Sequence, residues 1–166
     1  MSKPRPMTKP QLVAAIITRL ESDLTLFTAA ARQAHAAATH EECQPDNKYD
    51  TTALEASYLA QGQANRAQEI RQGLDAYRAL ELQAFDAATP VRQGALVTLA
   101  DEAGGERRLF IGPRAGGMKL ADPAGEIVVI TPASPLGQRL LGLTVGDELQ
   151  GPGAGRGTRY TLVAVS

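Results

Sequence analysis

Carboxylates gather at one short stretch of this chain, and they are the residues whose types and spacing could do chemistry. The acids are Glu41, Glu42, Asp46, Asp50 and Glu55, with Lys48 among them. Carboxylate oxygens are the ligands that hard cations such as Mg²⁺ take, but acids also cap helices and interact with the helix dipole. Capping and favourable interaction with the dipole suit Asp50 and Glu55. Glu41 and Glu42 instead lie at the C-terminal end of a helical pattern, where acids oppose the dipole. The stretch is therefore a candidate binding surface.

Other constellations of reactive residues give little support to catalysis. His35 and His40 lack a third ligand at zinc spacing, and Cys43 has only His40 nearby as a base. GXSXG, HEXXH and CXXC patterns are absent, which argues against a self-contained hydrolase or redox enzyme. The Gly-rich segment 151–157 lacks the Lys-Ser/Thr ending of a P-loop and is expected to be a hairpin loop. We therefore expect that the protein is not itself an enzyme.

The acidic stretch is the turn between two long helical patterns. Pro45 cannot continue a helix, and the Asp and Asn residues around it favour turns. The first helix begins with a capping box at 8–11, and the second with another at 52–55. The second helix is expected to end near Ala88, because Pro90 disfavours helix before it. Two long helices joined by a short turn lie antiparallel, so residues 40–50 form the tip of a hairpin about 45 Å long.

Each helix carries an apolar seam whose residues become smaller toward the tip. The expected seam of the first helix is Val13, Ile16, Leu20, Leu24, Phe27, Ala31, Ala34 and Ala38. That of the second is Ala53, Ser57, Ala60, Ala64, Ala67, Ile70, Leu74 and Tyr77. The spacing is that of a coiled coil. Small facing residues let helices approach closely, although alanine is also a good helix former. We expect a thin probe suited to a narrow passage.

After Pro90 the pattern changes to short strands separated by turns. Strands are expected over 95–100, 107–111, 118–121, 127–131 and 159–165, and the chain turns back into a strand over 145–149. A short helix is expected over 134–142, with Ser134 as its N-cap and Gly142 as its stop. The expected fold class is α+β, with an antiparallel two-helix coiled coil over 8–88 and a small antiparallel β domain with one short helix over 91–166.

The composition is typical of an intracellular protein. The 166 residues include 17 basic and 18 acidic ones, and the net charge of −1 gives no argument for nucleic-acid binding. The single cysteine excludes an internal disulfide and fits a reducing compartment. Neither a signal peptide nor a run of about 18 apolar residues is present. We expect a cytoplasmic monomer with no membrane partner.

Two stretches resemble the GreA/GreB family of transcript-cleavage factors. Residues 130–142 read ITPASPLGQRLLG, followed by VGDE at 145–148 and YTL at 160–162, which is similar to the C-terminal signature of that family. DNKY at 46–49, with Ala53 beyond, resembles the start of the family's second coiled-coil helix. The order of parts, a helical hairpin and then an FKBP-like domain, is also that of the family. The resemblance covers nearly the whole chain.

The resemblance implies a transcription elongation regulator that binds bacterial RNA polymerase. In such factors the C-terminal domain binds at the rim of the secondary channel and the coiled coil enters it. Tip carboxylates help hold Mg²⁺ at the polymerase active site, where a second metal assists water attack on backtracked RNA at its 3′ end. No cofactor is expected to bind stably to this chain itself.

Residue by residue, the resemblance assigns three groups of positions. The metal-directed acids are Asp46 and Glu42, and the other tip contacts are Glu41, Asn47, Tyr49 and Asp50. The polymerase-docking residues of the C-terminal domain are Ser134, Pro135, Leu136, Gly137 and Asp147.

The tip departs from the G-D-L-S-E-N pattern usual in the family. Aligning Asn47 with the family's Asn places Asp46 at the Glu position and Cys43 at the Asp position, with Glu42 one residue earlier. Such a tip leaves two outcomes open, stimulation of RNA cleavage and inhibition by occupying the channel.

Two hypotheses from other classes compete with this one. A peptidyl-prolyl isomerase needs an aromatic-lined pocket for proline, for which the C-terminal half offers only Phe110 and Tyr160. A structural coiled-coil adaptor would tolerate neutral substitutions at the tip with its binding unchanged.

Overall fold

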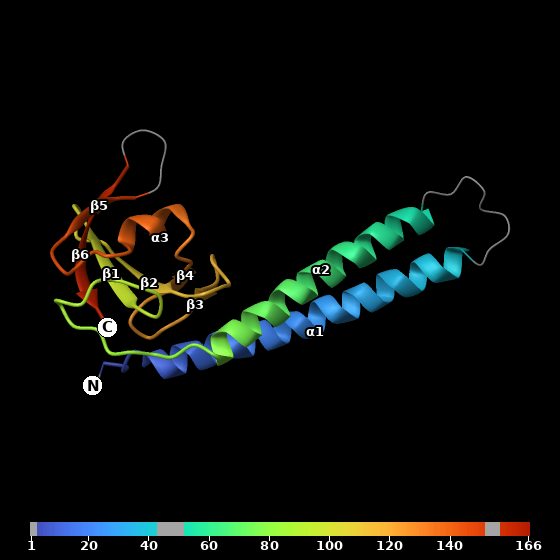
Figure 1. Cartoon of the computed structure of the whole chain (residues 1–166), viewed down its shortest axis with the longest axis horizontal. Coiled ribbons are helices and arrows are strands. Elements are labelled where there is room, and N and C mark those ends of the chain that lie inside the picture. The colour runs from blue at the N-terminus through green and yellow to red at the C-terminus, as the bar shows by residue number, and fades with distance from the viewer. Residues whose placement is uncertain (1–2, 43–51, 152–156) are drawn as a thin grey trace. The chain divides into compact units, whose positions relative to one another are not determined.

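The computed structural model describes residues 3–42, 52–151 and 157–166 (Figure 1). The chain divides into two compact units, one of Ile17–Asp75 and one of Met1–Ile16 with Ala76–Ser166. Helix α1 (Lys9–Glu42) contributes to both units, and helix α2 (Thr52–Arg78) lies mostly in the first. The domain ranges 8–88 and 91–166 stay a prediction.

Helix α1 begins with the capping box that the sequence predicts. The amide of Thr8 donates to Oε1 of Gln11 at 2.9 Å, and the amide of Gln11 donates to Oγ1 of Thr8 at 3.3 Å. These reciprocal bonds satisfy amides that a helix start otherwise leaves without acceptors. The local sequence alone therefore fixes where α1 begins.

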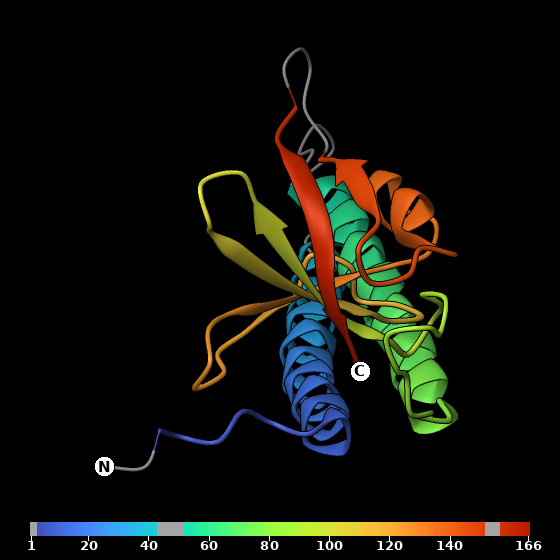
Figure 2. The same ribbon diagram turned by 90° about the vertical axis from the view of Figure 1, so that its left-hand side faces the viewer.

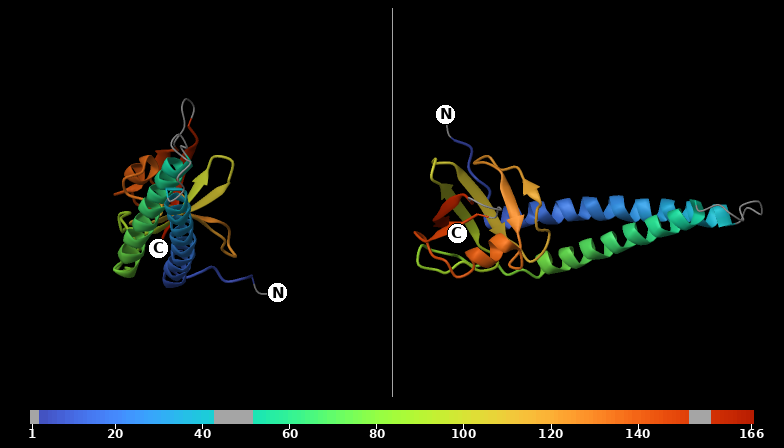
Figure 3. Two further views of the ribbon diagram at one scale, coloured as in Figure 1. Left: turned by 90° about the vertical axis from the view of Figure 1, so that its right-hand side faces the viewer. Right: turned by 90° about the horizontal axis from the view of Figure 1, so that it is seen from above.

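The unit of Ile17–Asp75 is a helical pair. Figures 1 and 3 show α1 and α2 running side by side in opposite directions. The guanidinium of Arg66 on α2 lies 5.9 Å from the ring centroid of Phe27 on α1, a contact between the helices. The predicted antiparallel pair is confirmed.

Helix α2 ends at Arg78, and the prediction of an end near Ala88 was wrong. Tyr77 is buried, and the amide of Leu80 turns back to the carbonyl of Tyr77 at 3.3 Å. Beyond this turn, Phe85 packs against the core of the sheet, and its ring lies 4.5 Å from Nζ of Lys9. Helix propensity alone favours a helix over segment 79–88, but these contacts hold the segment in a non-helical conformation.

The strands form one sheet in the order β3-β4-β2-β1-β6-β5. They are β1 (Leu96–Asp101), β2 (Glu106–Ile111), β3 (Lys119–Leu120), β4 (Ile127–Ile130), β5 (Glu148–Gln150) and β6 (Arg159–Val165). Each predicted strand is present with slightly different ends. The sheet is mostly antiparallel as predicted, but β2 and β4 pair in parallel, with Arg108 opposite Ile127 and Ile111 opposite Ile130.

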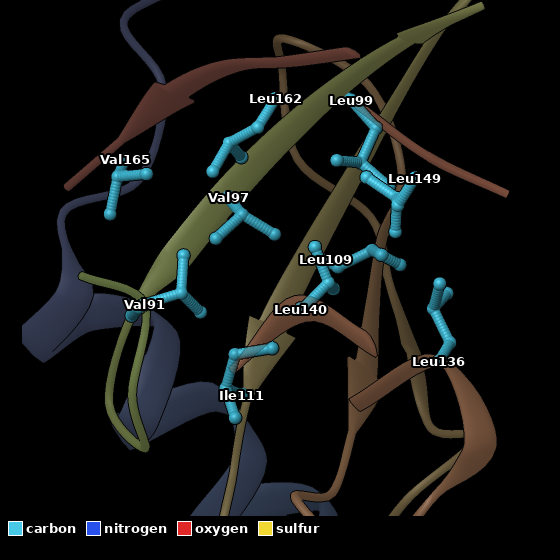
Figure 4. Packing of buried hydrophobic residues seen from close by; sticks show 11 residues of the cluster. Val91, Val97, Leu99, Leu109, Ile111, Leu136, Leu140, Leu149, Leu162 and Val165 are labelled. Atoms are coloured by element: carbon cyan, nitrogen blue, oxygen red, sulfur yellow. The ribbon is translucent and has the colours of Figure 1, made fainter. Parts of the chain in front are cut away.

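The core of this unit lies between the sheet and helix α3 (Pro135–Leu140). In Figure 4, Leu109 and Leu140 point toward one another, with Val97, Ile111 and Leu136 around them. Alternate residues of β1 face the same side, so Val97 and Leu99 are both fully buried. Each such side chain contributes about 1.5–3 kcal/mol on burial. Figure 2 shows α3 in orange beside the red strands β5 and β6, and Arg139 of α3 donates to the carbonyl of Gln150 at 2.8 Å.

Candidate functional site

The predicted tip site lies at or beyond the edge of what the structure describes. Asp46, Asn47, Tyr49 and Asp50 fall outside the described residues. Glu41 and Glu42 are the last residues of α1, but their side chains are not described. The metal-directed role of Asp46 and Glu42 therefore stays a prediction.

The stem that carries the tip has a buried seam close to the predicted one. All predicted seam residues of α1 are buried or half-buried, and so are those of α2 except Ala64. Toward the tip the most buried seam residues are Ala34 and Ala38, at 8% and 3% exposure. Toward the other end of the pair they are Leu20, Ile70 and Leu74. The predicted gradient from large to small buried residues is present.

At Ala64 the seam departs from the prediction. Ala64 is exposed, and Gln63 takes the half-buried position, with its Oε1 buried and without a hydrogen-bond partner among the described residues. The half-buried and buried positions of α2 run through Ala56, Ala60, Gln63 and Ala67, which continues the coiled-coil alternation. Sequence reasoning missed Gln63 because it followed apolar residue types, although the spacing alone points to position 63.

A groove of about 520 Å³ lies between the two helices on the face where Ala64 is exposed. Its floor is small, with Ala31, Ala60, Ala64 and Ala67. Its rim is polar, with Thr28, Arg32, His35, Ser57, Gln61 and Arg71. Alanine leaves space that a larger side chain would fill, so the small residues of the seam open a groove on this face. They also allow the two helices to approach closely.

The described residues that line the groove include two arginines and no acid. The sequence has no Asp or Glu between Asp23 and Glu41 or between Glu55 and Glu69. Arg71 donates to Oε1 of Gln68 at 3.3 Å, and in the described part of the chain neither Arg71 nor Arg32 has a carboxylate partner. Residues 24–40 and 56–68 therefore contain no acid, and the acid nearest to Arg71 along α2, Glu69, is paired with Arg66.

The predicted docking residues of the C-terminal half build α3 and the turn that follows it. Oγ of Ser134 accepts from the amide of Gly137 at 3.0 Å and donates to the carbonyl of Thr131 at 2.8 Å, so Ser134 is the predicted N-cap. Pro135 opens the helix and is exposed, whereas Leu136 is buried in the core.

Gly137 and Asp147 also have clear local roles. A Cβ on Gly137 would lie 2.0 Å from the carbonyl oxygen of Thr131, so only glycine fits there. Oδ2 of exposed Asp147 accepts from the amide of Thr144 at 2.9 Å. Because Leu136 and Gly137 are buried, any contribution they make to docking is through the position of α3. Docking by these residues stays a prediction.

A shielded ion pair that sequence reasoning missed holds the N-terminal segment to the sheet unit. Arg108 of β2 donates to Oδ2 of Asp122 at 2.6 Å, and the amide of Met7 donates to Oδ1 at 2.7 Å. Burial raises the pKa of Asp122, but these bonds, that from the amide of Ala124 and the charge of Arg108 outweigh it and lower the pKa. No local sequence signal joins residues 7, 108 and 122, which come together only in the fold.

A metal site, a proline pocket and a membrane span find no counterpart in the described part of the chain. Among the side chains that the structure describes, those of residues 3–39, 53–151 and 157–166, no three of His, Cys, Asp or Glu gather as a metal site would require. Phe110 is fully buried and Tyr160 packs on the core, so these two rings do not line a proline pocket. None of the helices in the described part of the chain combines the length and apolar character of a membrane span.

Comparison with solved structures finds proteins similar to this chain. The structure of the transcription factor Gfh1 covers 90% of this chain and 92% of its own at 23% identity and a TM-score of 0.41. GreA factor homolog 1 of Thermus thermophilus covers 90% and 94% at 22% identity and a TM-score of 0.39. The prokaryotic elongation factor GreA/GreB of Nitrosomonas europaea covers 63% and 79% at 23% identity and a TM-score of 0.38.

The sequence comparisons give no relative. No protein-family model and no curated protein matches the chain. Because the structural identities are below 25% and the TM-scores below 0.5, function has to be inferred from the residues of this chain. Gre-type transcription factors are thus what the chain is similar to.

Proposed function

We propose that this chain regulates transcription elongation by binding bacterial RNA polymerase and inserting its helical hairpin into the secondary channel. The observation that carries the proposal is the buried seam of the helical pair, which shrinks from leucine and isoleucine to alanine toward the acidic tip. A pair with small buried residues is thin where it must pass a narrow opening. The C-terminal signature over 130–148, which folds as α3 and its flanking turns, supports docking of the second unit at the channel rim.

In the cleavage version of this function, the chain supplies only carboxylate oxygens. Asp46 and Glu42 would be the ligands to a Mg²⁺ ion that the polymerase holds, an ion that such oxygens suit. That ion stabilises the attacking and leaving oxygens during hydrolysis of backtracked RNA. The partner-binding residues of the tip beside these acids would be Glu41, Asn47, Tyr49 and Asp50.

Inhibition without cleavage is the second candidate, and the composition of the tip favours it. Cys43 stands where the family pattern has an Asp, which removes one carboxylate from the expected spacing. A hairpin that occupies the secondary channel without all the carboxylates needed to bind Mg²⁺ would not stimulate cleavage. It would block entry of cleavage factors and of substrate to the polymerase active site. A coiled-coil adaptor without a channel role remains the third reading.

A backtracked elongation complex with end-labelled RNA and Mg²⁺ separates these three functions. RNA length is followed with time after addition of the wild-type protein, the Asp46→Ala variant or the Glu42→Ala variant. Lys48→Ala is the matched tip control, because it changes the tip without removing a carboxylate.

Shortening that is lost in Asp46→Ala and kept in Lys48→Ala establishes a cleavage factor. Competition with a channel-binding cleavage factor, without shortening, establishes an inhibitor. Absence of any binding to the polymerase refutes the proposed function and leaves the adaptor.

A further inference from the structure

The groove between α1 and α2 has the features of a docking site for a helix. We propose that it receives an acidic amphipathic helix of the RNA polymerase, so that three helices pack together at the middle of the hairpin. This inference rests on the proposed function for the identity of the partner. It concerns a different part of the hairpin from the tip.

The dimensions of the groove suit a helix rather than a single side chain. Its α2 wall extends from Ser57 to Arg71, which is about 21 Å, or four helical turns, at 1.5 Å per residue. Its floor of Ala31, Ala60 and Ala64 is apolar and low, so the backbone of a third helix can come close. Helix-in-groove recognition uses such a surface, with apolar anchors on one face of the incoming helix.

The charge of the rim indicates which helix fits. Arg32 and Arg71 flank the groove on opposite helices, and His35 adds a third basic group. Its described lining residues include no acid. Both arginines lack a carboxylate partner within the described residues, so a partner carboxylate would not have to displace an existing ion pair. A helix with carboxylates on either side of an apolar stripe is therefore complementary.

The same residues favour a protein helix over a nucleic-acid strand. Binding of single strands uses aromatic side chains on which bases stack, and the described lining of the groove offers one imidazole, that of His35, and no Phe, Tyr or Trp. The alanine floor offers apolar contact, which a sugar–phosphate backbone does not use. Two arginines on opposite walls suit isolated carboxylates better than a continuous row of phosphates.

Charge reversal and groove filling test this docking. The double variant Arg32→Glu/Arg71→Glu is expected to slow association with core RNA polymerase about tenfold at low salt. Ala64→Phe is expected to weaken binding by a similar factor, because its ring occupies the groove. The matched control is Arg19→Glu, which reverses an exposed arginine of α1 outside the groove and is expected to change binding less than about twofold. Circular dichroism checks that every variant keeps its helices.

Photocrosslinking identifies the occupant. A photoreactive residue at Gln61, on the rim, is compared with one at Leu26, which is 66% exposed and lies outside the groove. A crosslink from position 61 to a polymerase helix bearing Asp or Glu, with none from position 26, supports the inference.

Two results overturn the inference while leaving the proposed function intact. They are a crosslink from position 61 to RNA alone, and wild-type binding that all groove variants retain. Failure of the wild-type protein to bind polymerase overturns both.

Discussion

Replacing Tyr77 by phenylalanine is expected to lower the melting temperature of the sheet-containing unit by about 4–7 °C. Tyr77 is 1% exposed, and its hydroxyl donates to the carbonyl oxygen of Arg114 at 2.6 Å. Burial raises the pKa of the Tyr77 hydroxyl well above its ordinary value, so it remains a donor at every pH of practical interest. The substitution removes this one bond and keeps the ring.

The expected loss of stability is about 1.5 kcal/mol. A hydrogen bond contributes about 0.5–1.5 kcal/mol, and stranding a buried acceptor costs more. Arg114 is an exposed residue and the bond to its carbonyl is only part-buried, so we take the value for a hydrogen bond and not the larger cost of a stranded acceptor. A small void adds to it, because the hydroxyl fills the space above Gly112, where an added Cβ would lie 2.1 Å from it.

Differential scanning calorimetry measures the shift, and urea unfolding gives the free energy. Tyr58→Phe is the control, because Tyr58 is 69% exposed and its substitution is expected to change the melting temperature by less than about 1 °C. Gly112→Ala supplies a second arm. It is expected to destabilise strongly in the wild-type protein and less in the Tyr77→Phe background, since the clashing oxygen is gone. A Tyr77→Phe variant as stable as wild type, or strict additivity with Gly112→Ala, would refute the reasoning.

Three further predictions concern other residues. The pKa of Asp122 is lowered in the fold, so its ionised form contributes to stability above a pH of about 4. This contribution is lost as the pH falls through the lowered pKa. The acid unfolding of Asp122→Asn should therefore depend less on pH in that range than the unfolding of the wild-type protein. Gly137→Ala places a Cβ 2.0 Å from the carbonyl oxygen of Thr131 and should cost about 3 kcal/mol in urea unfolding, whereas Gln138→Ala on the exposed face should cost under about 0.5 kcal/mol. Gln63→Leu should stabilise the helical pair by about 1 kcal/mol, measured by thermal loss of helix, because it removes a buried oxygen without a partner; a loss of stability would mean that Gln63 has one.

The sequence predicts elements whose signals are local and repeated. The capping box at 8–11, the N-cap Ser134, the stop at Gly142 and most seam positions depend on residues a few places apart, and they are found in the structure. Gly142, for example, has φ of +86°, the left-handed conformation that such a stop requires. The short strands and turns of the C-terminal half were likewise predicted from residues close together in the sequence.

Features that depend on distant residues were not predictable in the same way. The end of α2 at Arg78 follows from the burial of Tyr77 and the packing of Phe85, which local propensity does not contain. The parallel pairing of β2 with β4 and the pair of Arg108 with Asp122 are set by topology. At the candidate site, the acids of the tip were found by residue type, whereas the groove became visible only when α1 and α2 were placed together.

The unit that contains the sheet also contains Met1–Ile16, and this has consequences for folding during synthesis and for truncation of the chain. The bond from the amide of Met7 to Asp122 joins positions 115 residues apart, so that part of the unit forms only after most of the chain has been synthesised. A fragment of 91–166 alone would leave Asp122 without the Met7 amide, and would lack Tyr77 and Lys9 with their contacts to Arg114 and Gly94. Residues 17–75 are therefore all synthesised before the other unit is complete. That unit consists of the residues that precede and follow them in the sequence, and its last strand is the end of the chain.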